Sequence, residues 1–526
     1  MIVALIILYV LLRAYVNWSG SRRWAEAKAM LAMEGETLDF EKLQPLPVDE
    51  SLNFCAIEPL RDITLPGDEK SAPGLKRAAM ENTVWKYYHA PTDRPAGGKR
   101  KKGIPPAMQI ISPPSIRGGR ALGLSCDIHA WAAFARASNY AALPAESGDP
   151  GRDLLGGIDA SHPLLRQLAE AASVRPEAVF VPRLHPPTPL FAVMLQFSPT
   201  QTVTNALVVR AMAACEGGNS PAACQSVQAV LRFVDAAARE PLLIGVLVAV
   251  TNHEKGEEAV WTILKKRQAT GTELQALQAS LAKLDFRKTV LMEMRGELAA
   301  AIDVMEYVQA GPHRLPELMD PLWDGSTWDG SSPPPAPTTL KRLLWGLVPS
   351  GWFDHNKAVI TTMEIEEIIR PLRQGNAQEV LRHLAAFDAE LKAYQGPFHP
   401  RHRLVNVMAP AFSSVIERTF EADAIRRQAV IACALERYYL QRKSYPAALV
   451  ELVPQFIAAI PADPMDDHPM RYRQTSDGRY MLWSVGFDQK DDNGKVNIEP
   501  DNKLSVRRPY KRGYKGDWTW QYQPIK

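Results

Sequence analysis

This chain has few cysteines and a small net charge, and each of these features excludes a class of protein. The 526 residues include only 5 cysteines, too few for the disulfide framework that holds a small secreted domain together. Lys and Arg number 61 against 58 Asp and Glu, and a formal charge of +3 gives no sign of a nucleic-acid-binding protein. Hydrophobic residues make up 46% of the chain, which is typical of a globular protein and excludes wholesale disorder.

Complete catalytic and cofactor-binding motifs are also missing. There is no Gly-rich phosphate loop, nucleophile elbow or dinucleotide fingerprint. His253 and Glu254 begin like a zinc-protease motif, but Glu257 stands where that motif needs its second histidine. His399 and His402 are close together without the cysteines or carboxylates that would complete a metal site. The sequence therefore predicts no reaction, and we expect the protein not to be an enzyme.

The one long apolar run lies at the N-terminus. Residues 1–16 read MIVALIILYVLLRAYV, somewhat shorter than the roughly 20 residues that usually span a bilayer. Arg13 can extend its charged group toward the headgroups, and Tyr15 and Trp18 suit the membrane interface. We predict a membrane anchor over residues 1–20. A cleaved signal peptide and a buried core helix are the alternatives.

The side of the membrane is indicated by two opposing observations. Arg13, Arg22 and Arg23 follow the apolar run, and the positive-inside rule places such residues in the cytoplasm. A resemblance in the C-terminal region favours export instead. We expect a single-pass protein of the inner membrane whose body lies in the periplasm. In that compartment Cys215 and Cys224, which bracket the helix-breaking stretch EGGNSPAA, could form a disulfide.

Composition and periodicity divide the chain into units. A Pro- and Gly-rich stretch opens with one plausible helix, Ser21 to Glu34, and two later stretches have the apolar spacing of helices. A run of prolines separates the two helical stretches. The predicted units are 1–20 (membrane anchor), 21–160 (Pro/Gly-rich irregular region), 161–320 (helical hairpins), 321–339 (Pro-rich linker), 340–417 (second helical region) and 418–526 (α+β domain).

Helix-start signals place the helices of the hairpin region. Ser198-Pro199 and Ser220-Pro221 each read as an N-cap followed by Pro at the first helical position, and Thr272 with Gln275 fits a capping box. The apolar stretch Leu242–Val250 is too short to span a membrane, so we expect a buried core helix there. Short connections predict antiparallel pairs. The predicted helices are 199–216, 221–238, 241–267, 272–284 and 287–309.

Two segments are strongly basic. Between Arg94 and Arg120 there are seven basic residues and no acidic one, and from Asp501 to Lys526 there are seven basic residues against two acidic. Each segment could bind an anionic lipid or polyanion. A solvated loop is the alternative for the first segment. For the second, Trp518 and Trp520 could instead cover the sheet of the C-terminal unit.

The C-terminal unit changes from helical to strand periodicity. A helix is predicted from Ala422 to Arg442, followed by a second short helix within residues 449–460. Strands are predicted at Met470–Arg473 and Arg479–Ser484, and they pair as a hairpin because Ser476-Asp477-Gly478 between them is a strong turn signal.

The order of motifs in this unit resembles a known family. The long helix is followed by Tyr445-Pro446, by Pro461-x-Asp463-Pro464, by Met470-x-Tyr472 and by Tyr480-x-x-Trp483-Ser484-x-Gly486-x-Asp488. This order resembles the globular domain of the major pseudopilin of type II secretion systems. It also resembles the ending of uncharacterised membrane-anchored bacterial proteins, whose start is similar to VNWSGSRRWAEAKAMLAMEGETLDFEKLQP here. The pseudopilin resemblance covers residues 418–526, a fifth of the chain.

The resemblance implies a calcium site. Pseudopilins of this family bind calcium in the loop after the Ser-x-Gly-x-Asp strand, so the predicted metal site comprises Ser484, Asp488, Asp491 and Asp492. Calcium takes six to eight oxygen ligands, which clustered aspartates and loop carbonyls can supply. A solvated acidic turn around Asn493-Gly494 is the alternative. The family's processed leader is missing at the N-terminus, so we do not expect this chain to assemble a filament.

These features together predict a fold and a role. We expect a mainly helical body with a small α+β pseudopilin-like C-terminal domain, attached to the membrane by an N-terminal helix. The expected role is non-enzymatic: a structural or interaction module of the bacterial cell envelope, linked to type II secretion or a pilus-like system. Protein partners would bind the helical region, and no nucleic acid is expected. The alternatives are an envelope hydrolase with a non-contiguous active site and a polyanion or lipid binder.

Overall fold

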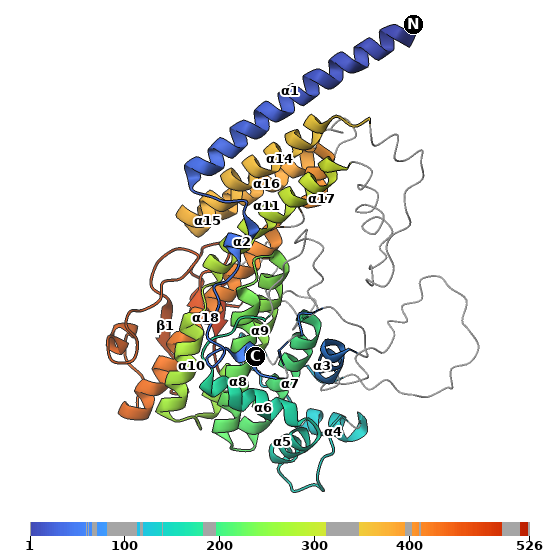
Figure 1. Ribbon diagram of the computed structural model, residues 1–526. Coiled ribbons are helices and arrows are strands. Elements are labelled where there is room, and N and C mark those ends of the chain that lie inside the picture. The colour runs from blue at the N-terminus through green and yellow to red at the C-terminus, as the bar shows by residue number, and fades with distance from the viewer. Residues whose placement is uncertain are drawn as a thin grey trace, which may run out of the picture.

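The computed structural model describes most of the chain and shows a mainly helical protein with one small sheet (Figure 1). The linker 321–339, His399 and most of both basic segments lie outside the described residues. The described residues are 2–58, 60–61, 63–65, 71–81, 113–115, 119–138, 140–181, 196–311, 347–394, 402–409, 412–496 and 516–523.

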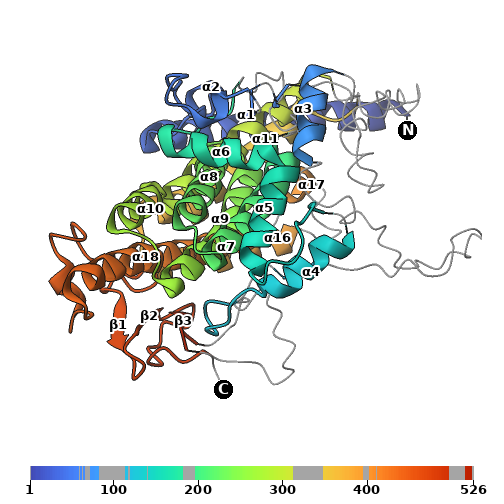
Figure 2. The same ribbon diagram turned by 90° about the horizontal axis from the view of Figure 1, so that it is seen from below.

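The five predicted central helices are all present. Each begins and ends within about two residues of its predicted bounds, and Figure 2 shows the helices gathered in one array. Their apolar side chains contribute to one core. The stretch that begins at Leu242 is a buried part of a longer helix, as expected. The helices are α7 (Phe197–Glu216), α8 (Ser220–Ala238), α9 (Leu243–Lys266), α10 (Gly271–Lys283) and α11 (Phe286–Ala310).

Three of the predicted helix starts are wrong in detail. At α7 the residue before the helix is Gln196, which makes no side-chain cap hydrogen bond, and Ser198 already lies inside the helix. The capping box of α10 is formed by Thr270 and Glu273, and not by Thr272 and Gln275. Thr270 has an extended backbone, with φ −74° and ψ 162°, which an N-cap residue requires, whereas Thr272 is already helical. At α8 the cap is Asn219, whose side chain accepts a hydrogen bond from the Ala222 backbone N–H at 3.1 Å.

Further helices flank this array on both sides. Helices α3, α4 and α5 lie in the region predicted to be irregular, and α5 has the Asp149 cap with Pro150 at its first position. A π-helical turn, Ile365–Ile369, joins α14 to α15. The flanking helices are α2 (Phe40–Leu43), α3 (Ala72–Glu81), α4 (Ile128–Ser138), α5 (Pro150–Ser161), α6 (Pro163–Val174), α14 (Ser350–Glu364), α15 (Arg370–Gln374), α16 (Ala377–Tyr394) and α17 (Arg403–Met408).

Helix α1 (Ile2–Glu34) joins the apolar N-terminal run to the body without a break. Its first half is exposed: Val3 is 68% and Leu8 is 62% exposed. Its second half is packed, because Trp24 and Leu31 are buried in the main core. Among the described residues, α1 is the one helix long and apolar enough to cross a bilayer, a test that a signal sequence also passes. Figure 1 shows its N-terminal half extending beyond the body.

Two glycines bring α1 and α14 into close contact. A Cβ atom on Gly20 would lie 2.0 Å from the carbonyl oxygen of Gly351, and one on Gly351 would lie 2.2 Å from that of Val16. Only glycine fits at such a backbone approach. At the far end of α1, Glu34 pairs with Arg370 at 2.7 Å and also with Arg373, which together hold the pKa of Glu34 below its usual range.

Helix α18 (Phe412–Arg442) is the longest helix of the C-terminal unit and starts earlier than residue 418. It lies against α9, α10 and α11 (Figures 1 and 2). The main core continues from α1 through these helices to Tyr522. Trp261 of α9 donates a hydrogen bond to the Gln521 carbonyl at 2.9 Å and stacks on Tyr522. The described residues on either side of position 418 therefore share one core.

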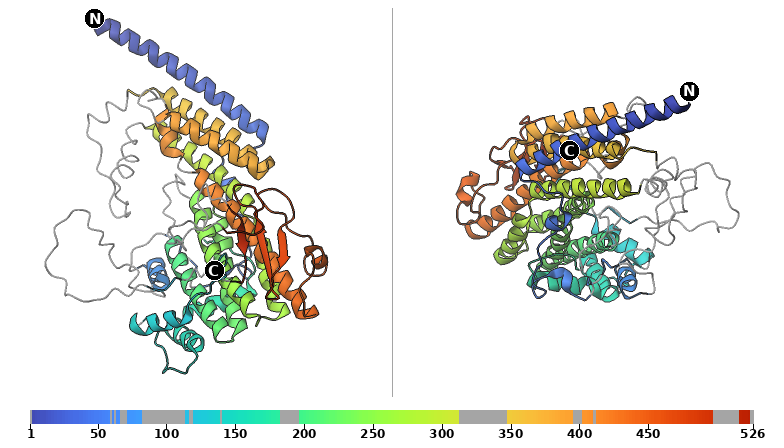
Figure 3. Two further views of the ribbon diagram at one scale, coloured as in Figure 1. Left: turned by 180° about the vertical axis from the view of Figure 1, so that it is seen from behind. Right: turned by 45° about the horizontal axis from the view of Figure 1, so that its top comes forward.

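The predicted hairpin is confirmed and a third strand is added. β1 (Arg471–Gln474) pairs with β2 (Tyr480–Ser484), and β2 pairs with β3 (Trp518–Trp520), both antiparallel (Figure 3). Gly478 adopts φ 71° in the turn. The region expected to hold a second short helix is a 3₁₀ turn, Leu449–Leu452. Trp518 and Trp520 are fully buried, so these aromatic residues cover the core side of the sheet.

All five cysteines are free thiols. Cys215 and Cys224 are both buried and are not bonded to each other, contrary to the disulfide considered for an exported body. Cys215 lies near the end of α7, and its Sγ is 3.7 Å from the carbonyl oxygen of Thr262 in α9. Burial raises the pKa of the Cys215 thiol to about 12, which keeps it protonated and unreactive.

Candidate functional site

The loop after β2 folds back onto the residue that precedes β3. Ser484, the last residue of β2, pairs with Trp518, so Asp517 lies beside the start of the loop. The Asp517 backbone N–H donates to the Lys495 carbonyl at 3.2 Å, which fixes the end of the loop against it. Pairing of β2 with β3 thus brings Asp517 close to an acidic loop that is adjacent to it only in the folded chain.

Asp517 has a buried carboxyl group with one uncommitted oxygen. Its Oδ2 accepts a hydrogen bond from the Gly494 backbone N–H at 2.6 Å, and the residue is fully buried. Its Oδ1 makes no hydrogen bond among the described residues, although the Asp492 backbone N–H lies close enough to the carboxyl group to affect its pKa. Burial, with the nearby negative charges of Asp491 and Asp492, raises the pKa of Asp517 to about 6. The site therefore holds an oxygen that gains free energy from a ligand able to contact it.

The predicted ligands Asp491 and Asp492 lie on the exposed side of this loop, apart from Asp488. Asp491 Oδ1 accepts hydrogen bonds from Trp483 Nε1 and from the Asn493 backbone N–H, both at 2.9 Å. Asp491 and Asp492 are exposed and Asp488 is half-buried. The loop therefore brings Asp491 and Asp492 close enough to Asp517 to affect its pKa, whereas Asp488 bonds locally, to the Lys490 backbone N–H at 3.4 Å.

The predicted ligand Ser484 points to another carboxylate. Its Oγ donates to Asp463 Oδ1 at 2.7 Å, and both residues are fully buried. Asp463 also accepts from the Val485 backbone N–H at 3.0 Å and from Arg471 at 2.8 Å. The Pro-x-Asp-Pro motif therefore fixes the end of β2 through the Asp463 carboxylate. The hydroxyl of Ser484 is committed to this contact.

The loop has the tight backbone that a cation-binding turn needs. Gly486, Gln489, Asn493 and Gly494 all have positive φ, between 54° and 76°, which turns successive carbonyl groups in different directions. Gly494 has φ 76°, and a Cβ atom there would lie 2.5 Å from Met481 Sδ, so a larger residue would displace the Met481 side chain and glycine is favoured. Carbonyl and carboxylate oxygens are the ligands that calcium prefers. In the part of the chain that the structure describes, no three His, Cys, Asp or Glu side chains form a preassembled metal group.

A second set of carboxylates lies inside the helical body and has a structural role. Glu297 and Glu293 on α11 accept hydrogen bonds from the Leu243 and Val246 backbone N–H groups, at 2.7 and 2.9 Å. These carboxylates replace a side-chain cap, which Leu242 cannot provide. Glu364 on α14 is fully buried, and neither of its oxygens has a partner among the described residues. Burial, and the nearby Glu297, raise the pKa of Glu364 well above its usual value.

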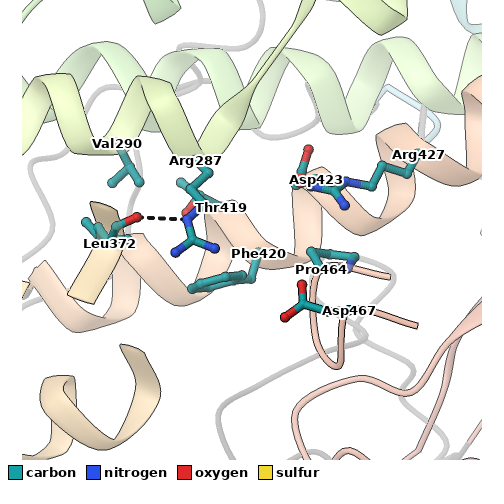
Figure 4. Close-up of a pocket in the computed structure, with 9 residues that line it drawn as sticks. All are labelled: Arg287, Val290, Leu372, Thr419, Phe420, Asp423, Arg427, Pro464 and Asp467. Atoms are coloured by element: carbon teal, nitrogen blue, oxygen red, sulfur yellow. Dashed lines mark hydrogen bonds and ion pairs between the residues drawn. The ribbon is translucent and has the colours of Figure 1, made fainter. Parts of the chain in front are cut away.

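Two cavities adjoin α18, and neither lining contains a Ser/His or Cys/His pair. The first, of about 30 Å³, is only large enough for a single water molecule (Figure 4). There Arg287 donates to the Leu372 carbonyl at 2.8 Å, and Asp423 is paired with Arg427 at 2.7 Å. The second, of about 660 Å³, is an open groove between α10, α18 and residues 454–461. The first is lined by the carboxyl groups of Asp423 and Asp467 and is too small for a substrate, and the second has no carboxyl group or histidine in its lining.

Sequence reasoning missed two residues of the candidate site. In the sequence Asp463 stands out only as part of Pro461-x-Asp463-Pro464, and Asp517 only as one of two acidic residues in the basic C-terminal segment. The sequence feature that could have identified Asp517 is its position directly before Trp518-Thr519-Trp520. A strand rich in aromatic residues that pairs with β2 brings the residue before it to the edge of β2.

In comparisons with known protein families, with curated proteins and with solved structures, no match to this chain was found.

Proposed function

We propose that this protein is a single-pass, membrane-anchored module of the bacterial cell envelope with a structural or interaction role and no catalytic activity. One observation carries the proposal: α1 is a single helix whose exposed apolar half continues into a half that is part of the core. A flexible tether would allow the body to move freely. A continuous helix with a glycine contact to α14 instead fixes the body at one orientation to the bilayer.

The C-terminal unit supports the more specific part of the proposal. A sheet stacked on a long helix, with a tight acidic loop after β2, agrees with a pseudopilin-like domain and with calcium held near Asp517. Calcium is abundant outside the cytoplasm, so such a site favours a periplasmic body of an inner-membrane protein. We propose a role linked to type II secretion or a pilus-like apparatus, in which the helical body presents surfaces to protein partners.

Two measurements on the full chain test the anchor and the orientation. Membranes containing the protein would be washed at alkaline pH, which releases peripheral proteins and retains those with a spanning helix. A variant lacking residues 2–16 should be released, whereas the full chain should stay with the membrane. For orientation, alkaline phosphatase fused after Lys526 should be active if the body is periplasmic.

Three results would contradict the proposal. Release of the full chain by the alkaline wash would exclude a spanning α1, and an N-terminus found to begin after residue 20 would indicate a cleaved signal peptide. An inactive phosphatase fusion, together with a fluorescent cytoplasmic reporter at the same position, would place the body in the cytoplasm. That result would agree with the basic residues after the apolar run and would remove the argument for calcium.

A further inference from the structure

A cluster of three nitrogen-containing side chains lies where α1 leaves its apolar segment. Arg23 Nη1 is 3.3 Å from His355 Nδ1, and His355 Nε2 is 3.0 Å from His402 Nε2. The His402 ring lies against Tyr394, with centroids 4.1 Å apart. These side chains come from α1, α14, α16 and the residue before α17, so the cluster exists only when the body is packed on α1.

The hydrogen bonds of the cluster indicate that it attracts an anion. A guanidinium is always a donor, so His355 Nδ1 must accept from Arg23, and His355 Nε2–H then donates to His402. Arg23 is exposed and forms no ion pair with a carboxylate among the described residues. A neutral imidazole nitrogen is a weak partner for a guanidinium, and a phosphate oxygen in its place would form a shorter, charge-assisted bond.

Carboxylates on the same helices are held by other partners. Glu390 accepts from the Tyr394 hydroxyl at 2.5 Å, and Asp354 pairs with Lys357 at 3.0 Å. On the neighbouring turn, Arg22 pairs with Glu26 at 3.0 Å. A metal cation is disfavoured, because the described residues of the cluster supply two imidazoles and the permanent positive charge of Arg23 contacts one of them. An anion can accept from Arg23, and each imidazole can donate to it through its one ring N–H once the contact between the two rings is released.

The position of the cluster along α1 identifies the source of the anion. Tyr15 and Trp18 are exposed and their rings lie 6.3 Å apart, as expected for residues at a membrane interface. At 1.5 Å of rise per residue, Arg23 lies roughly 7 Å beyond Trp18, which is the level of the lipid phosphates. The body reaches even further toward the apolar end, since Tyr9 donates to the Leu347 carbonyl at 2.7 Å and Leu347 is 53% exposed.

We propose that Arg23, His355 and His402 form a binding site for the phosphate of an anionic lipid headgroup. The proposal rests on the membrane anchor proposed above. A lipid phosphate bound here contacts α1 and the helices of the body together, and so strengthens the junction that orients the body. The site uses none of the residues of the two basic segments.

The test uses the full chain in nanodiscs made of phosphatidylcholine with a minor fraction of phosphatidylglycerol. The lipids that remain bound after detergent extraction are identified by mass spectrometry. We expect phosphatidylglycerol to be enriched over its bulk fraction, and Arg23→Gln to reduce the enrichment about tenfold, the effect of losing one charge-assisted hydrogen bond. Arg166→Gln is the matched control, because Arg166 is an exposed helical arginine on α6, in the body.

A second readout does not depend on the stability of a variant. Diethyl pyrocarbonate modifies accessible imidazoles, and the modification of His355 and His402 is measured in discs with and without phosphatidylglycerol. Protection by phosphatidylglycerol supports the lipid site. Equal modification in both discs, or equal enrichment in Arg23→Gln and the parent chain, overturns it. Protection by inorganic phosphate in pure phosphatidylcholine discs, without lipid enrichment, would overturn the lipid as the source.

The two proposals fail in different ways. If the chain does not co-elute with the discs at all, the anchor itself is contradicted and the lipid site with it. If the chain is incorporated but shows neither enrichment nor protection, only the lipid site is contradicted.

Discussion

At the scale of single residues, the carboxyl groups of Asp517 and Glu364 are both buried at an energetic cost, and they differ in how that cost can be reduced. Both are buried, and each has at least one oxygen without a hydrogen-bond partner among the described residues. Burial disfavours the charged form of both. Asp517 lies beside an acidic loop open to solvent, where a cation can neutralise it. Glu364 lies inside the helical body and can only keep its proton.

We expect Asp517→Asn to abolish a calcium response. Calcium should raise the melting temperature of the full chain, because a ligand that binds only the folded state stabilises it by a few kcal/mol when it greatly exceeds its dissociation constant. The response should be absent in Asp517→Asn and retained in Asp467→Asn, a control whose residue is exposed and has a φ of 59°, which Asn accepts. A full response in Asp517→Asn would exclude Asp517 as a ligand.

Asp517 should also make stability depend on pH without calcium. Its pKa is about 6 in the folded chain, above the value of about 4 in an unfolded chain. The folded state therefore retains a proton that the unfolded state has released, and stability falls as pH rises from about 4 to 6. The fall should amount to at most about 3 kcal/mol and should be smaller in Asp517→Asn. Chemical denaturation at several pH values measures it; identical profiles would contradict the assignment.

For Glu364 we expect the neutral variant to be more stable. Since the pKa of Glu364 is raised, its carboxyl group destabilises the fold increasingly as pH rises above its unfolded value. Glu364→Gln should therefore stabilise the protein by about 1–3 kcal/mol at pH near 8 and have little effect near pH 4.5. Denaturant titrations at both pH values test this. The control is Glu366→Gln, two residues away and exposed; a gain there of equal size would point to surface charge instead.

At the scale of elements, the contact of α1 with α14 depends on two glycines. Gly351→Ala would place a methyl group 2.2 Å from the Val16 carbonyl oxygen, so the helices must separate. We expect a loss of about 1–3 kcal/mol and faster amide exchange in residues 20–34, measured on the reconstituted chain. Gly156→Ala, in an exposed part of α5 with open space around it, should instead stabilise by about 0.5–1 kcal/mol. Unchanged exchange in Gly351→Ala would show that the contact does not hold the junction.

At the scale of the whole molecule, α18 belongs to the body as much as to the C-terminal unit. It packs on α9, α10, α11 and α16, and Trp261 of α9 stacks on Tyr522. A fragment of residues 418–526 would expose this apolar surface of α18 to water. We expect it to lack a fixed tertiary structure, as measured by near-ultraviolet circular dichroism and by the absence of cooperative melting. A cooperative melt would show that the C-terminal unit is an autonomous domain.

The sequence by itself determined the features that depend on neighbouring residues. The bounds of the five central helices followed from apolar spacing and from breakers between them, and the hairpin followed from Ser476-Asp477-Gly478. The apolar run over residues 1–16 likewise indicated α1. Local signals were ambiguous only in detail, as at Thr270 and Thr272, where two identical residues lie two positions apart and backbone geometry decides which one caps the helix.

Tertiary structure alone decided everything that depends on contact between distant segments. Asp517 meets Gly494 because β3 pairs with β2, Glu293 caps α9 from another helix, and Arg23 meets His355 because α14 lies on α1. Each of these side chains is ordinary in its own stretch of sequence. The protonation, the partners and the exposure of these side chains depend on burial and on the charges of remote residues. The periodicity of the local sequence gives no information about that burial or about those charges.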